Sequence, residues 1–362
     1  MKKKNILITG GTGSFGKNFV NYLLKNNLFN RIVIFSRDEL KQYEMKNFFK
    51  NNPKLRFFIG DVRDIERLKM ALDKIDYVVH AAALKQVDTG EYNPFEFIKT
   101  NIMGAQNIIE ASFYSKVKKI IALSTDKASS PVNLYGATKL CSDKLFCSAN
   151  TMFGSKQTIF SVIRYGNVML SRGSVIPLFQ GIKNNEYQIT DTKMTRFTIS
   201  MNQAIDLVMW AIVNSIGGEI IIPKIPSYKI LDLVKVFSKN PKIKIIGIRK
   251  GEKIHEEMIS SEESRNCIEV DGKYIIGTNG FSGYHKKKKR FIIKNFDKES
   301  FRSNENKFLN PKELLQTINK EYKNYIFWSK WNIANIKRYE IIDIDTKGDF
   351  LYVKKIYRLQ KK

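Results

Sequence analysis

The sequence contains few cysteines and few histidines, with three of each in 362 residues. An odd number of cysteines without a Cys-x-x-Cys pair is typical of a reducing cytoplasm, where cysteines serve as small core residues. The histidines lie far apart in sequence and show no metal-ligand spacing. We therefore predict a cytoplasmic protein without a bound metal. The cysteines are Cys141, Cys147 and Cys267, and the histidines are His80, His255 and His285.

Long hydrophobic runs are also lacking. The most apolar stretch, 207–213, is too short to cross a bilayer, which takes about 20 residues. The segment Met1–Lys4 is basic like the start of a signal peptide, but the apolar run Ile6–Ile8 behind it stops at once in a glycine-rich turn. These features predict neither a transmembrane helix nor a secretory signal, and we expect no membrane partner.

Acidic residues are scarce beside basic ones. The chain has 35 Asp and Glu against 62 Lys and Arg, a formal net charge of +27. Nucleic acid or an anionic membrane surface would explain this charge. The lysines are scattered through the whole chain, however, which favours solvated lysine-rich faces, and basic clefts also attract polyanionic cofactors and substrates. We interpret the run Lys286–Arg290 as a solvated turn or disordered loop, and we expect no nucleic-acid partner.

Short apolar runs alternate with amphipathic stretches through the first half of the chain. Strands separated by helices predict an α/β fold of the Rossmann type, with a doubly wound parallel sheet. Ligands of such sheets lie beyond the carboxyl ends of the strands. The predicted strands are Asn5–Thr9, Arg31–Phe35, Leu55–Ile59, Tyr77–His80, Lys119–Ser124 and Thr158–Arg164, and the predicted helices include Ser14–Lys25 and Asp38–Lys50.

The alternation becomes irregular after about residue 176. The segment 217–223 is typical of short strands, whereas Asp232–Phe237 and His255–Ile259 are predicted to be helical. We therefore expect a Rossmann domain over residues 1–175, to which some later segments return, and a smaller C-terminal substrate-binding lobe over 176–320. Residues 321–362 form an extension for which the sequence indicates no role.

A glycine-rich turn, Thr9–Gly16, follows the first predicted strand and opens the first helix. Gly10 and Gly13 permit a tight turn in which backbone N–H groups approach a pyrophosphate, and Gly16 lets the helix pack closely on the sheet. The helix presents the positive end of its dipole to the phosphates. This context favours a dinucleotide site over a turn without a ligand. The predicted contacts are Gly10, Thr12, Gly13, Ser14, Phe15 and Gly16.

The residues at the end of the second strand indicate which dinucleotide binds. An NAD site would hold an acidic residue there for the ribose 2′-hydroxyl. Ser36, Arg37 and Lys41 instead suit a 2′-phosphate, since a guanidinium pairs strongly with phosphate, while Asp38 can cap the following helix. We therefore predict NADP. Asp38 is also predicted to contact the cofactor, as are Asp61, Val62 and Ala81 at the ends of the third and fourth strands.

A Tyr-x-x-x-Lys pair follows the fifth strand, which ends in Ser124–Lys127. Tyr135 and Lys139 are four residues apart and share one face of a predicted helix. A free tyrosine has a pKa of about 10, but a nearby ammonium and a cationic nicotinamide ring both favour the phenolate. Tyr135 could then accept the proton of a sugar hydroxyl during its oxidation. We predict both residues as catalytic and as contacts of the cofactor.

With these motifs the chain resembles the extended short-chain dehydrogenases/reductases. Within them it is similar to the inverting UDP-N-acetylglucosamine 4,6-dehydratases of the flagellin and pseudaminic acid pathway, from about residue 4 to about residue 315. The resemblance rests on several long motifs in the same order. They are Thr9–Gly16, Ser36–Gln42, His80–Lys85, Glu91–Pro94, Ser124–Lys139, Arg164–Met169, Ser171–Val175, Met194–Phe197 and Gly247–Met258.

The Asp126–Lys127 pair is the decisive detail of this resemblance. Retaining 4,6-dehydratases have Thr-Asp-Glu at this point, with the glutamate as base. The resemblance implies that Lys127 removes the C5 proton beside a 4-ketone, its pKa lowered by burial or by the cationic cofactor, and that Asp126 helps the C6 hydroxyl leave. Two alternatives stay open: a nucleotide-sugar 4-epimerase or reductase on the same scaffold, and a non-catalytic NADP-binding interaction protein.

The resemblance also implies a substrate site and a homo-oligomeric enzyme. Arg196 and Arg249 would contact the diphosphate of UDP-N-acetylglucosamine, and Glu252 its ribose. Leu170 and Lys250 depart from the family pattern, which has glycine and proline there. The remaining predicted substrate contacts are Lys85, Thr125, Asn167 and Thr195, and the remaining cofactor contacts are Lys85 and Val168.

Overall fold

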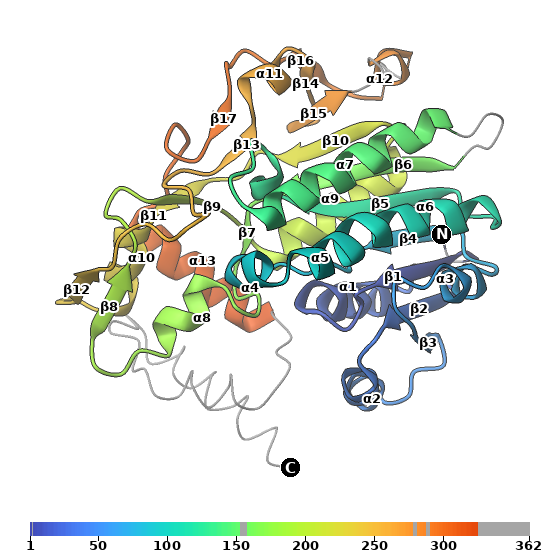
Figure 1. Cartoon of the computed structure of the whole chain (residues 1–362), viewed down its shortest axis with the longest axis horizontal. Helices are drawn as coiled ribbons and strands as arrows, with labels where there is room; N and C mark the ends of the chain where they lie inside the picture. The colour runs from blue at the N-terminus through green and yellow to red at the C-terminus, as the bar shows by residue number, and fades with distance from the viewer. Residues whose placement is uncertain (2, 153–157, 278–280, 287–289, 325–362) are drawn as a thin grey trace.

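The computed structural model describes residues 1, 3–152, 158–277, 281–286 and 290–324. Its main feature is one ten-stranded sheet of order β16-β14-β15-β10-β6-β5-β4-β1-β2-β3 (Figure 1). The first six strands pair in parallel, as predicted from their apolar runs. They are β1 (Asn5–Thr9), β2 (Arg31–Ser36), β3 (Leu55–Ile59), β4 (Tyr77–His80), β5 (Lys119–Thr125) and β6 (Ile159–Tyr165).

Later segments of the chain complete the same sheet. Strand β10 (Glu219–Pro223) pairs in parallel with β6 and antiparallel with β15 (Lys273–Gly277). Strands β14 (Cys267–Val270) and β16 (Ile293–Asn295) continue the antiparallel edge. The sheet is thus mostly parallel, with an antiparallel extension from the second half of the chain. The Rossmann-type fold class predicted from the sequence is confirmed.

Helices cover both faces of the sheet. On one face α3 (Ile65–Ala71) packs on α6 (Gly104–Phe113), which packs on α7 (Leu134–Met152). On the other face α1 (Ser14–Lys25) packs on α9 (Met201–Asn214). The sheet interior is apolar, as expected for strands buried on both faces. The other helices before β5 are α2 (Glu39–Phe48), α4 (Val87–Tyr92), α5 (Pro94–Phe97) and the π-helical η1 (Ile98–Met103).

The chain after β6 also builds three small sheets beside the main one. They pair β9 (Thr195–Ile199) with β7 (Asn167–Val168) and β11 (Ser227–Lys229), β8 (Glu186–Ile189) with β12 (Lys242–Ile245), and β13 (Glu257–Ile259) with β17 (Phe301–Arg302). The accompanying helices are α8 (Val175–Gln180), α10 (Ile230–Phe237), α11 (Ser261–Ser264), α12 (Ser282–Lys286) and α13 (Pro311–Asn324).

One predicted element is wrong and two others lie partly outside the described residues. The segment His255–Ile259 was expected to be helical, but its second part is strand β13. The reason is long-range pairing: Glu256 N–H donates to Ser303 Oγ and Ser303 N–H to the Glu256 carbonyl, at 2.9 and 2.8 Å. Residues 287–289 of the basic run, and residues 325–362 of the extension, lie outside the described residues. No helix among the described residues is long and apolar enough to cross a membrane.

Candidate active site

A cavity of about 830 Å³ opens at the carboxyl ends of the parallel strands. Such a volume lies in the range of small-molecule sites. Its walls come from the first turn, the ends of β2, β4 and β5, the start of α7, and loops after β6 and β12. Of the predicted site residues, all line the cavity except Asp126 and Thr195. No group of three or more metal-ligating side chains occurs in the described part of the chain.

The glycine turn has a backbone shape that only glycine fits well. Gly10 has φ of +63°, and a Cβ there would lie 2.8 Å from the Ala82 nitrogen. A Cβ on Gly16 would lie 2.3 Å from the Gly11 oxygen, so α1 starts close against the strand. No side chain caps the N-terminus of α1, whose cap residue is Gly13. Free N–H groups at a positive helix end, facing a cavity, fit the pyrophosphate of a dinucleotide.

The end of β2 carries hydroxyl and basic groups toward the same cavity. Ser36 ends the strand, and Arg37 is half exposed, with its guanidinium 3.6 Å from Asp61. The Asp38 carboxylate has partners within the protein. It caps α2 by accepting from Lys41 N–H at 2.9 Å, and it also pairs with the Lys41 ammonium. These contacts hold the pKa of Asp38 below its ordinary value. The expected capping role of Asp38 is confirmed.

Tyr135 and Lys139 lie on the first turns of α7 and both face the cavity. A nearby ammonium favours the phenolate as predicted, since the Lys127 charge acts to lower the pKa of Tyr135, but burial has the larger effect in the protein alone. Burial raises the pKa of Tyr135 to about 12, outweighing the Lys127 charge and a hydrogen bond with Thr125. Lys139 is buried, and burial lowers its pKa against the opposing charge of Asp143.

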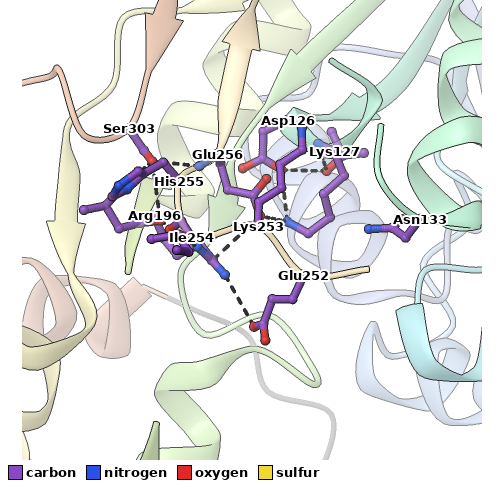
Figure 2. Close-up of polar contacts among 12 residues, drawn as sticks. Asp126, Lys127, Asn133, Arg196, Glu252, Lys253, Ile254, His255, Glu256 and Ser303 are labelled. Atoms are coloured by element: carbon purple, nitrogen blue, oxygen red, sulfur yellow. Dashed lines mark hydrogen bonds and ion pairs between the residues drawn. The ribbon is translucent and has the colours of Figure 1, made fainter. Parts of the chain in front are cut away.

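Lys127 lies directly after β5, in the short 3₁₀ segment η2 (Asp126–Ala128). Its Nζ is 3.2 Å from Asp126 Oδ1 and 2.9 Å from Glu256 Oε1, and its side chain extends between the two carboxylates (Figure 2). The expectation of a lowered pKa is therefore wrong: burial acts to lower the pKa of Lys127, but the Asp126 and Glu256 carboxylates outweigh it and raise the pKa. These two contacts favour the ammonium form of Lys127 in the protein alone.

Asp126 and Glu256 form the acidic side of this cluster. Asp126 is fully buried, and burial, together with the Glu256 charge, raises its pKa. Burial opposes ionisation of Glu256 as well, yet the Lys127 and Arg196 cations hold its pKa below the ordinary value. Thr125 Oγ1 donates to Asp126 Oδ1 at 3.0 Å and lines the cavity. Sequence reasoning missed Glu256; its only signal was membership of the Gly247–Met258 motif.

The predicted substrate contacts divide into two groups. Arg196 is buried, 3.4 Å from Glu252 and 3.7 Å from Glu256, and Figure 2 shows it across from Lys127. Arg249 is half exposed at the mouth, 3.5 Å from Glu252. Thr195, by contrast, faces away from the cavity, because its hydroxyl contacts His255 Nδ1 at 2.8 Å and Ser303 Oγ at 2.7 Å.

Loops from different parts of the chain close the cavity. Lys85 Nζ donates to the Arg172 carbonyl at 3.0 Å, and Arg172 N–H donates to Ser14 Oγ at 3.2 Å. Asn133, which also lines the cavity, donates from Nδ2 to the Gly251 carbonyl at 2.7 Å. Asn167 and Val168 of β7 line the same cavity.

A Rossmann-type sheet, a glycine turn at its first helix and a Tyr-x-x-x-Lys pair on one cavity define an extended short-chain dehydrogenase/reductase. The profile of one family, described as polysaccharide biosynthesis protein, matches residues 6–278. The chain belongs to this family.

Two relatives are similar to most of this chain and have different names. A protein of Campylobacter jejuni subsp. jejuni serotype O:2, named UDP-N-acetylglucosamine 4,6-dehydratase (inverting), is 54% identical over 329 residues, which cover 88% of this chain and 98% of that protein. A Rickettsia bellii protein named UDP-glucose 4-epimerase is 46% identical over 286 residues, which cover 76% and 84%.

Solved structures agree with the fold. The X-ray structure of Pen from Bacillus thuringiensis is 38% identical, with a TM-score of 0.81, and covers 88% of this chain and 98% of that chain. The structure of DesIV, a dTDP-glucose 4,6-dehydratase from Streptomyces venezuelae, is 22% identical with a TM-score of 0.61, covers 69% and 86%, and supports the fold alone.

Proposed function

We propose that this protein is an NADP-dependent UDP-N-acetylglucosamine 4,6-dehydratase that inverts C5. The observation that carries the proposal is the Asp126–Lys127 pair at the end of β5, with Lys127 facing the same cavity as Tyr135. The 54% identity to the Campylobacter relative of that name supports it. The product would be a UDP-2-acetamido-2,6-dideoxy-L-arabino-hexos-4-ulose.

The cavity contains suitable groups for the cofactor. The glycine turn and the start of α1 would hold the pyrophosphate, and Ser36, Arg37 and Lys41 would hold a 2′-phosphate. When bound, a nicotinamide dinucleotide takes a hydride from C4 of the sugar and later returns it to C6. No acidic residue ends β2, which favours NADP over NAD.

The protein's own residues would handle the protons. Tyr135 takes the proton of the C4 hydroxyl after its own proton has passed to solvent, a loss that the positive charges of Lys127 and of a bound nicotinamide would favour. The 4-ketone acidifies the C5 proton, which Lys127 removes after its own resting proton has passed to solvent. Asp126, kept neutral by burial, supplies the proton with which the C6 hydroxyl leaves as water. When C6 receives the hydride, C5 takes a proton from the opposite face, which inverts it. Arg196, Arg249 and Glu252 bind the UDP portion in this proposal.

The proposal also includes the compartment, the assembly and the pathway of the protein. We infer a cytoplasmic homo-oligomer whose product serves pseudaminic acid or a related surface sugar, such as that of a glycosylated flagellin. The motif resemblance supports the pathway, and the cysteine content supports the compartment.

A 4-epimerase is the second candidate, because the Rickettsia relative carries that name. Incubation with UDP-N-acetylglucosamine in D₂O, followed by proton NMR and mass spectrometry, distinguishes the two. The dehydratase gives loss of one water, a new 6-methyl signal and deuterium at an inverted C5. An epimerase gives a C4 epimer of unchanged mass, and unchanged substrate would contradict both.

A further inference from the structure

Two carboxylates share one ammonium in the wall of the cavity. Asp126 Oδ1 and Glu256 Oε1 lie on either side of Lys127 Nζ, at 3.2 and 2.9 Å. The second oxygens, Asp126 Oδ2 and Glu256 Oε2, are buried and have no hydrogen-bond partner among the described residues. The two side chains are 0% and 2% exposed. Each carboxylate charge disfavours ionisation of the other, and for Asp126 burial adds to this effect, so that its pKa is raised.

The neighbours decide which carboxylate holds the proton. Glu256 has a second cation, since Arg196 Nε lies 3.7 Å from Glu256 Oε1. Asp126 contacts no cation other than Lys127 within the described structure, and its further contact is the Thr125 hydroxyl. Both donors of Asp126 reach Oδ1, which leaves Oδ2 as the oxygen for a proton. The negative charge therefore belongs on Glu256 and the proton on Asp126.

We propose that Glu256 is a positioning residue of the dehydration: its carboxylate clamps the Lys127 ammonium and, by carrying the negative charge, keeps Asp126 a neutral acid. This inference rests on the proposed function. Thr125, which contacts Asp126 and lines the cavity, connects the buried acid with the substrate space. Glu256 thus sets the charges of the residues that give and take protons, although it lies on a different structural element.

Replacing Glu256 by glutamine removes the charge and keeps the size. Without the anion, the pKa of both Asp126 and Lys127 falls, by one unit or more for a charge at this distance. In the pH profile of the activity, the rise with pH reports loss of the Lys127 proton, and the fall reports loss of the Asp126 proton. Both the rise and the fall therefore move to lower pH. The charged groups facing the cluster are Arg196 of β9 and Lys253, and the other titratable groups are Tyr135 of α7 and Tyr228 of β11. None of them is replaced in this variant.

The test measures the pH profile of dehydration in three variants. We expect Glu256→Gln to move the optimum at least one unit toward acid, with a lower kcat, while Glu256→Asp keeps the optimum within about 0.3 units because it keeps the charge. Glu257→Gln is the matched control, since the neighbouring Glu257 pairs with Arg302 outside the cavity. An unshifted optimum in Glu256→Gln, with only a slower rate, overturns the proposal. If Glu256→Gln does not fold and Glu256→Asp does, a pH optimum one unit lower in Glu256→Asp overturns the proposal.

A second measurement needs no substrate and separates the inference from the proposed function. The side-chain carboxyl of ¹³C-labelled Asp126, assigned by its loss in Asp126→Asn, is titrated by NMR. We expect a lower titration midpoint in Glu256→Gln than in the unchanged protein, and an equal midpoint overturns the inference. If the midpoint shifts but the unchanged protein does not dehydrate UDP-N-acetylglucosamine, the proposed function fails and the charge assignment stands.

Discussion

Replacing Arg164 by methionine tests the buried ion network beneath the catalytic helix. Arg164, on β6, is 0% exposed, and its guanidinium lies 3.4 Å from Asp143 of α7 and 2.8 Å from Glu263 of α11. It also donates to the Met258 carbonyl at 3.0 Å. Methionine fills much of the space but removes the guanidinium partner of the buried Asp143, which keeps the more distant interaction with the Lys139 charge. Breaking a buried pair in this way costs about 3–5 kcal/mol of the free energy of unfolding.

The assay is urea and thermal unfolding followed by fluorescence or circular dichroism. At about 2 °C per kcal/mol for a large domain, the loss corresponds to a Tm lower by about 6–10 °C. Arg265→Met is the control, because this exposed arginine should change the free energy of unfolding by less than about 0.5 kcal/mol. Adding Asp143→Asn to Arg164→Met should recover at least about 1 kcal/mol. A loss below about 1 kcal/mol in Arg164→Met, or no recovery in the double variant, would refute the reasoning.

Three further predictions concern the cofactor, the base and acid stability. Arg37→Ala should raise the Kd for NADP by about 10- to 100-fold and leave the Kd for NAD nearly unchanged, because only NADP has the 2′-phosphate. Fluorescence titration measures both Kd values, and an equal loss of affinity for the two cofactors would contradict the 2′-phosphate site. Lys127→Ala should abolish dehydration in the NMR assay but leave NADP affinity within about twofold, and retained turnover would remove Lys127 from the mechanism. Burial lowers the pKa of His80 to about 3, so the unfolded chain binds the extra proton first as pH falls below 6.5. Unfolding free energy should therefore drop by about 1.4 kcal/mol per pH unit between 6.5 and 3, and His80→Gln should reduce that slope in urea titrations.

Most of the first half of the fold could be predicted from local patterns. The runs Asn5–Thr9 and Leu55–Ile59 became β1 and β3 with the predicted bounds, because both are short apolar segments, although of the two only β1 is buried along most of its length. The antiparallel extension through β14 and β15 could not be predicted in the same way, since its place depends on pairing with β10. The segment His255–Ile259 failed for a related reason: its backbone partner, Ser303, lies far along the chain.

In the candidate site, too, local motifs were predicted correctly, whereas features that depend on distant residues were not. The glycine turn and the Tyr135–Lys139 pair are local motifs, and the structure brings them to one cavity as expected. The direction of the Lys127 pKa was predicted wrongly because it depends on the adjacent Asp126 together with Glu256, and no local pattern connects Glu256 with Lys127. Thr195 was assigned to the substrate from its motif, but a strand presents successive side chains to opposite faces, and Thr195 faces His255 and Ser303.

The position of β10 has a consequence for synthesis on the ribosome. Strands β1 to β6 are complete once residue 165 has emerged, but the free edge of β6 has no partner until Glu219–Pro223 arrives, and the strand β15 that covers β10 follows later still. A nascent chain that stops in between exposes an apolar strand edge, which can pair with another chain. Chaperone binding to stalled chains should therefore be strongest at intermediate lengths and decline once β15 has emerged. The order of strands in the finished sheet sets the period during which an unfinished molecule is open to aggregation.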